Sequence, residues 1–201
     1  TFLEHVSLYF RRLLAIVSPH QITSGGPVLL VQAEHAWECS NDQQGQDYLG
    51  EITRFIRENG ITIPVTNAND LWQEPPGTIS TWRGWADLLV HVRQLRSVHA
   101  NAPRLVSEFE AAVPGTWGDE SEAVRSPSMV LAHLAEILAA GAQPIVSPFH
   151  GGTNFGFHGG RVAGKANGFV TTNVAADAPL TEDGRRGPHY HAVRRLITFA
   201  N

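Results

Sequence analysis

Short apolar runs alternate with amphipathic segments along most of this chain. The apolar runs have the length of buried strands, and they lie at residues 28–33, 62–66, 104–108 and 144–148, with a weaker one at 78–80. Apolar residues at helical spacing fill the intervening and flanking segments, at residues 2–18, 44–59, 82–97, 126–140 and 189–199. Alternating strands and helices favour a parallel sheet with helices on its outer face. The sequence therefore predicts an α/β fold.

Bulk properties argue against several classes of function. The chain has 201 residues and a formal net charge of -4, so nothing indicates a surface for nucleic acid or an anionic membrane. Its one cysteine, Cys39, cannot form an internal disulfide. No apolar run approaches the roughly 20 residues that a membrane-spanning helix needs. The 10 histidines have no cysteine or carboxylate at metal-motif spacing, so we predict neither a metal nor a cofactor.

Residues 149–157, Phe-His-Gly-Gly-Thr-Asn-Phe-Gly-Phe, follow the last predicted strand. The paired glycines permit a sharp turn, and His150, Thr153 and Asn154 place three hydrogen-bonding side chains there. Three phenylalanines flank them. Polar groups beside aromatic faces suit a sugar, which has hydroxyl edges and a flat C–H face. The alternative is a glycine-rich loop fixed by local hydrogen bonds.

This stretch resembles a signature of glycoside hydrolase family 35, the β-galactosidase-type enzymes. Three more stretches resemble motifs of that family in the same order. Residues 24–32 (SGGPVLLVQ) resemble its GGPIIxxQ strand, residues 103–109 (PRLVSEF) its PxxxSEF strand, and residues 177–182 (DAPLTE) its DAPLxE segment. The resemblance implies a (β/α)8 TIM barrel followed by β-rich domains, with the acid/base on strand four and the nucleophile on strand seven.

The chain is short for a complete barrel, which typically needs about 250 residues. On the family template it begins at helix three and ends at helix eight, so it would supply roughly strands four to eight. We therefore expect residues 1–201 to be a partial glycoside hydrolase barrel domain without its N-terminal strands. The rest of the barrel and the β-rich domains would then lie elsewhere on a longer chain.

The resemblance places Glu108 at the position of the family nucleophile. Retaining glycosidases need two carboxyl groups roughly 5–5.5 Å apart, one to attack the anomeric carbon and one to exchange protons. Barrel enzymes place such groups at the C-terminal ends of strands. The alternative role for Glu108 is a structural ion pair with an arginine, since a carboxylate on a buried strand is costly to leave unpaired.

The acid/base motif departs from the family pattern. The family has QxENEY after strand four, whereas residues 32–37 are Gln-Ala-Glu-His-Ala-Trp. Glu34 matches the first glutamate, but Ala36 replaces the second, which is the proton donor. A methyl group cannot donate a proton, so Glu34 is our first candidate for a relocated acid/base. Glu38 could instead reach back from the following loop.

The family positions around the sugar are partly changed in this chain. Glu110 stands where an aromatic residue is common, and residues 174–176 (Val-Ala-Ala) replace two tyrosines and an aspartate. Three tryptophans, Trp72, Trp82 and Trp85, could form a sugar platform or pack in the core. The substrate-binding candidates that the resemblance implies are His35, Trp37, His150, Asn154 and Asp177.

Two functions follow from this pattern. The first is retaining hydrolysis of terminal β-galactosides or related sugars by a β-galactosidase-like enzyme. The second is a catalytically degenerate carbohydrate-binding or scaffold domain of the same fold. Under the first, Glu34, Glu108, His150 and Asn154 should converge at the C-terminal ends of the strands, with a carbohydrate as the partner in either case.

Overall fold

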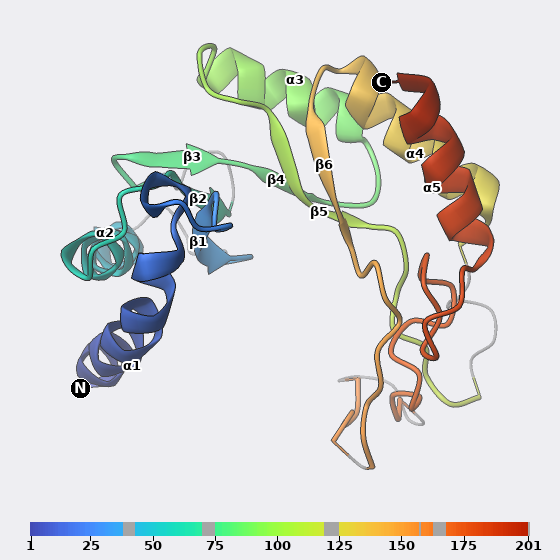
Figure 1. Cartoon of the computed structure of the whole chain (residues 1–201), viewed down its shortest axis with the longest axis horizontal. Helices are drawn as coiled ribbons and strands as arrows, with labels where there is room; N and C mark the ends of the chain where they lie inside the picture. The colour runs from blue at the N-terminus through green and yellow to red at the C-terminus, as the bar shows by residue number, and fades with distance from the viewer. Residues whose placement is uncertain (38–42, 70–74, 119–124, 157, 163–167, 201) are drawn as a thin grey trace. The chain divides into compact units, whose positions relative to one another are not determined.

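The computed structural model describes residues 1–37, 43–69, 75–118, 125–156, 158–162 and 168–200 (Figure 1). The chain divides into two compact units. The first unit comprises Thr1–Trp82 and Leu95–Pro103, and the second comprises Arg83–Gln94 and Arg104–Asn201. No described helix combines the length and the apolar character that a bilayer crossing requires.

The first unit is a three-stranded parallel sheet with helices. Its elements are α1 (Phe2–Val17), two short 3-10 turns (Ser18–His20 and Ile22–Ser24), β1 (Val31–His35), α2 (Gln43–Glu58), β2 (Val65–Ala68) and β3 (Thr78–Ser80). The strand order is β1-β2-β3, and both pairings are parallel. The predicted α/β class and the weak strand at 78–80 are therefore confirmed for this part of the chain.

One apolar cluster holds the helices of the first unit against its sheet. Leu14 of α1 is 1% exposed and meets residues from β1, α2 and β2. The buried members are Leu14, Ala33, Ile52, Phe55, Ile56, Ile61, Ile63 and Val65. Helix α2 ends as predicted, because Gly60 adopts a left-handed φ of 86° and the Asn59 amide donates to the Phe55 carbonyl (2.7 Å).

Strand β2 lies later in the chain than the predicted run at 62–66. Ile61 and Ile63 are buried as expected, but side chains rather than a neighbouring strand satisfy their backbone. The Gln21 Oε1 accepts from the N–H groups of Thr62 (2.7 Å) and Ile63 (3.2 Å). The Arg57 guanidinium donates to the carbonyls of Ile61 (3.1 Å) and Ile63 (2.7 Å). These bonds replace a strand ladder, so regular pairing begins only at Val65.

The first predicted strand also begins late. The run at 28–33 becomes β1 only from Val31, and Leu29 and Leu30 before it are 60% and 36% exposed. A turn around Gly26 precedes it. The Gly26 N–H donates to the Gln21 carbonyl (2.9 Å), and a Cβ on Gly26 would lie 2.1 Å from the His20 carbonyl oxygen. The turn therefore requires glycine at that position.

The second sheet has the strand order β4-β5-β6, formed by β4 (Trp82–Gly84), β5 (Leu105–Glu110) and β6 (Gln143–Ser147). Strands β5 and β6 are parallel. Helices α4 (Pro127–Ala139) and α5 (Pro188–Ala200) lie side by side in the second unit (Figure 1). Helix α4 begins as the sequence predicts, with the Ser126 hydroxyl accepting from the Met129 N–H (3.3 Å).

The predicted helix at 82–97 is shorter than expected. It is α3 (Leu88–Val98), and Trp82–Gly84 form β4 instead. Gly84 and Asp87 have φ values of 128° and 55°, which a right-handed helix cannot contain. Trp85 lies between them and stacks on Phe109, with ring centroids 5.6 Å apart and planes at 13°. Trp85 is therefore a packing residue.

The structure has two three-stranded sheets where the sequence predicted one. A single residue, Thr81, separates β3 from β4, and its N–H and hydroxyl both donate to the Asn67 carbonyl (2.9 and 2.8 Å). Strand β6 is an edge strand among the described residues, so Ile145 is 48% exposed rather than buried. The parallel orientation predicted for β1–β2 and for β5–β6 is confirmed.

Gln21 provides a test of the first unit. It is 2% exposed, and its amide also donates to the carbonyls of Ser18 and Gly60 (2.9 Å each). We expect Gln21→Leu to lower the free energy of unfolding by roughly 2 kcal/mol, because it strands buried N–H and C=O groups. Urea denaturation measures the change, with exposed Gln44→Leu as the control. Equal stability of the two variants would contradict this role.

Candidate functional site

The end of β1 holds the Glu34 carboxyl in a network with α2. The Tyr48 hydroxyl donates to Glu34 Oε2 (2.6 Å), and the His35 N–H donates to Glu34 Oε1 (3.0 Å). Burial, together with the hydrogen bond and the charge of Glu34, raises the pKa of the Tyr48 phenol well above its ordinary value. With a donor on each oxygen, the Glu34 carboxyl is an acceptor in this arrangement.

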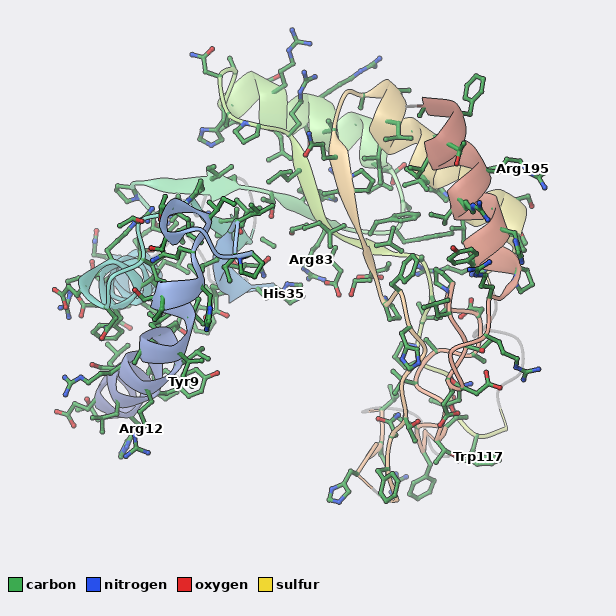
Figure 2. The ribbon with its side chains drawn as sticks, viewed as in Figure 1. Tyr9, Arg12, His35, Arg83, Trp117 and Arg195 are labelled. Atoms are coloured by element: carbon green, nitrogen blue, oxygen red, sulfur yellow. The ribbon has the colours of Figure 1, made fainter. Side chains whose placement is uncertain are left out.

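The residues after Glu34 extend the same network. The Trp37 ring lies 4.5 Å from that of Tyr48, and the Trp37 N–H donates to Asn69 Oδ1 (3.1 Å). His35 Nδ1 lies 3.1 Å from Gln32 Nε2, and Figure 2 shows His35 at the end of β1. Ala36 has a left-handed φ of 55°, so the strand ends at the position where the family pattern has its proton donor.

Glu108 lies in the last half of β5 and is half-buried. Phe109 after it is fully buried, so Glu108 and Glu110 share the other side of the strand. The Ser147 hydroxyl, at the end of the neighbouring β6, lies 3.4 Å from Glu108 Oε1 and donates to it. The adjacent C-terminal ends of two parallel strands therefore carry a carboxyl and a hydroxyl that meet.

Glu110 takes part in a charged cluster beside Glu108. Its carboxyl oxygens lie 3.9 Å from Arg83 Nη1 and 3.7 Å from Arg125 Nη2. The Arg125 guanidinium stacks over Trp85 at 3.8 Å from the ring centroid. Burial lowers the pKa of Arg125, whereas the carboxylates of Glu110 and Asp177 act in the opposite direction. The cluster places two arginines near the end of β5.

Hydrogen bonds within the second unit fix the signature loop. The Gly152 N–H donates to His150 Nδ1 (3.1 Å), and His150 Nε2 lies 3.2 Å from the Glu182 carbonyl oxygen. The Thr153 hydroxyl donates to the Glu182 carboxyl. The Asn154 amide donates to the Thr171 carbonyl (2.9 Å). Hydrogen bonds thus fix these side chains, as the alternative interpretation expected, but most of the partners lie 17 to 32 residues later in the chain rather than within the loop.

The DAPL segment pairs with the signature loop. The Gly151 N–H donates to the Leu180 carbonyl and the Leu180 N–H donates to the Phe149 carbonyl, both at 2.8 Å. A Cβ on Gly151 would lie 2.8 Å from the Ala175 carbonyl oxygen, so this close approach needs glycine. Asp177 Oδ2 accepts from the Arg125 N–H (2.8 Å), which ties the segment to the start of α4.

The second unit therefore links four of the predicted site residues. Glu108 contacts the end of β6, which leads directly to His150 and Asn154, and the DAPL pairing brings in Asp177. Glu34, His35 and Trp37 belong to the first unit, so their convergence with Glu108 stays a prediction. Glu38 and Trp72 lie outside the described residues.

Sequence reasoning missed three partners of the candidate carboxyls. Tyr48 falls at an apolar position of the helical pattern at residues 44–59, but a tyrosine there can also present its hydroxyl to a strand end. Ser147 lies two residues before the signature, and its position at a strand end was a usable signal. Arg125 gave none, because its contacts with Glu110 and Asp177 join distant parts of the chain. Among the described residues, no cluster of three or more His, Cys, Asp or Glu could hold a metal ion.

Comparisons with known proteins find relatives with beta-galactosidase names. Beta-galactosidase-1-like protein 2 of Homo sapiens is 30% identical over 200 residues, covering 96% of this chain and 31% of that protein. Beta-galactosidase 8 of Oryza sativa subsp. japonica is 26% identical over 212 residues and is covered to the same 31%. The chain thus spans about a third of the length of these curated relatives.

Solved structures support the fold. A β-glucuronidase from Ruminococcus gnavus superposes with a TM-score of 0.66 at 14% identity, over 98% of this chain and 35% of that one. A GH2 β-galacturonidase from Eisenbergiella tayi gives 0.63 at 13% identity. At such identities the likeness concerns the fold alone. Residues 1–200 match the profile of Glycosyl hydrolases family 35, and the chain belongs to that family.

Proposed function

We propose that this chain is part of a retaining glycoside hydrolase of β-galactosidase type, acting on terminal β-galactosides or related sugars. One observation carries the proposal. Glu108 lies half-buried near the C-terminal end of a parallel strand, with the Ser147 hydroxyl of the next strand on its Oε1. Family membership and the names of the curated relatives support the same activity.

We further propose that the two units are strands four to eight of one (β/α)8 barrel. In this assignment β1 is strand four, β2 is strand five, β3 and β4 together are strand six, and β5 and β6 are strands seven and eight. The parallel pairings and the single residue between β3 and β4 support it. The remaining strands and the β-rich domains would belong to the full-length protein.

The mechanism we propose is double displacement. A Glu108 carboxylate oxygen forms a bond to the anomeric carbon while the bond to the leaving oxygen breaks, and that oxygen keeps the electron pair. Water then attacks the glycosyl ester, gives a proton to a base, and releases the sugar and the Glu108 carboxylate. The arginines near the end of β5 pair with Glu110, two residues beyond the proposed nucleophile.

Glu34 remains our candidate acid/base, with Tyr48 as the residue that positions it. The Tyr48 hydroxyl and the His35 N–H each donate to one Glu34 oxygen, which suits a proton acceptor. Such a carboxylate can serve as the base for the attacking water, whereas protonation of the leaving oxygen requires a donor. We propose that these contacts support the second step, in which Glu34 accepts a proton from water, better than the first, in which the leaving oxygen needs a proton.

The other candidates divide into two roles. We propose that His35 and Trp37, which follow the carboxyl of β1, contact the sugar. His150, Asn154 and Asp177 make bonds within the second unit, and we propose that they shape the wall of the sugar site through those bonds.

A non-catalytic carbohydrate-binding or scaffold domain is the second candidate function. Ala36 favours it, because this residue ends β1 at the proton-donor position and carries only a methyl group. Loss of a general acid typically costs about 10²–10⁴-fold in rate. Under this alternative, the chain would keep the residues that maintain the fold, but the protein would not hydrolyse its carbohydrate ligand.

Leaving-group dependence distinguishes the two functions. We expect the full-length protein to hydrolyse a nitrophenyl galactoside slowly and lactose hardly at all, since only the activated leaving group departs without a proton. Glu108→Gln should abolish the nitrophenyl release, with Glu58→Gln, which changes an exposed carboxyl at the end of α2, as the control. A fluorosugar inactivator that fails to label Glu108 would favour the non-catalytic domain.

Restoring the acid is the complementary experiment. Ala36→Glu should raise kcat/KM for lactose by at least about tenfold, within the ~10²–10⁴ that a positioned acid contributes. Ala36→Gln matches its size without a proton to donate, so it should leave the rate unchanged. Strong wild-type lactose hydrolysis that disappears in Glu34→Gln would show instead that Glu34 already supplies the proton.

Tyr48 makes stability depend on alkaline pH. Burial and the Glu34 carboxylate raise the pKa of the phenol above its ordinary value of 10.0, so the folded protein keeps a proton that the unfolded chain releases. The free energy of unfolding should therefore fall as pH rises above about 10. In Tyr48→Phe that part of the decline should be absent, which urea titrations at several pH values measure. Parallel pH profiles for both proteins would contradict the link.

A further inference from the structure

We propose that a pocket between Trp117 and Phe169 is a second carbohydrate site, which holds a sugar residue of a longer saccharide. The pocket has a volume of about 340 Å³, within the usual range for ligand sites. Its lining residues are Trp117, Gly156, Gly159, Gly160, Phe169, Val170 and Thr172. The class of ligand rests on the proposed function, whereas the site itself rests on its own geometry.

The aromatic walls of the pocket face solvent. Trp117 is 62% exposed and Phe169 is 52% exposed, so both rings are accessible to a ligand. Trp117 lies among the loops that follow β5 (Figure 2). The Arg161 guanidinium lies 4.7 Å from the centroid of the Phe169 ring and adds donor groups beside it.

A backbone ladder fixes these walls. The Trp117 N–H donates to the Phe169 carbonyl (2.8 Å), and the Val170 N–H donates to the Gly160 carbonyl (3.2 Å). Antiparallel bridges join Thr116 to Val170 and Arg161 to Phe169. The two rings therefore project from paired backbone segments, which limits the entropy lost when a ligand binds.

The chemistry of the lining suits a sugar. Aromatic faces attract the C–H face of a pyranose, while hydroxyl and backbone groups can bind its edge. Three of the lining residues are glycines, which leave the backbone open to a ligand because no Cβ stands in the way. Thr172 supplies a hydroxyl, and its carbonyl accepts from the Asn154 N–H (2.7 Å).

Asn154 joins this pocket to the signature loop. A Cβ on Gly159 would lie 3.1 Å from the Asn154 side chain, so that side chain packs directly behind the pocket. The Asn154 amide also donates to the Thr171 carbonyl, next to the lining residue Thr172. We infer that a saccharide longer than a disaccharide contacts both the signature loop and this pocket.

Binding of a β-linked galactotetraose to the full-length protein tests the site. Trp117→Ala and Phe169→Ala should each weaken binding about tenfold, the effect of losing one well-placed aromatic contact. Phe199→Ala, which removes an 88% exposed ring from α5, is the matched control and should leave the affinity unchanged. Isothermal titration measures the affinity, and unchanged melting temperatures show that the variants are folded.

Kinetics separate this site from the proposed function. Trp117→Ala should raise the inhibition constant of the tetraose against nitrophenyl galactoside hydrolysis and leave kcat/KM for the nitrophenyl galactoside unchanged, since the small substrate does not reach the pocket. Trp117-dependent binding without any turnover would uphold the site and reject the hydrolase. Equal tetraose affinity of Trp117→Ala, Phe169→Ala and the control would overturn the site. Equal acrylamide quenching of tryptophan fluorescence in wild type and Trp117→Ala, measured in the full-length protein, would also overturn it.

Discussion

Two backbone hydrogen bonds between Leu180 and the signature loop hold the candidate site of the second unit together. They bind Leu180, which follows the glycine-rich excursion, to the turn after β6. Gly151 makes the approach possible, because any Cβ there would collide with the Ala175 carbonyl. Once this pairing forms, Glu182 meets His150 and Thr153, and Asp177 meets Arg125. The loop therefore owes its shape to residues about 30 positions later in the chain.

Much of the fold could be predicted from local chemistry. The glycine after α2, the serine cap and first-turn proline of α4, and the alternation of strands with helices are all signals that act within a few residues, and the structure has each of them. Strand β2 was misplaced because Gln21, some 40 residues away, satisfies the backbone of Thr62 and Ile63. Helix α3 was extended too far because its apolar spacing continues through Trp85, which packs against Phe109 outside any helix. Long-range contacts decided both cases.

The candidate site was predictable to a smaller extent. Resemblance gave Glu108 and Glu34, since a motif carries its own position along the chain. Their partners came only with the structure, because Tyr48 and Ser147 reach them across 14 and 39 residues of sequence. The sequence pattern does not identify such partners, because a residue with a hydroxyl group on a helix or at a strand end cannot be told from other polar residues. The alternative interpretation anticipated hydrogen bonds for this loop, but nothing in the sequence identified Glu182 and Thr171 as the partners of His150 and Asn154.

The contacts of the two candidate carboxyls suit the nucleophile and the base of the proposed mechanism, but not its general acid. Glu108 lies on the strand that ends in Glu110, whose carboxyl pairs with two arginines. Glu34 accepts hydrogen bonds at both oxygens, and Tyr48 keeps its own proton because its pKa is raised. A general acid needs the opposite setting, one that disfavours charge on its carboxyl. Under the proposed function, Ala36 and the contacts of Glu34 therefore both favour substrates whose leaving groups need no proton over natural linkages.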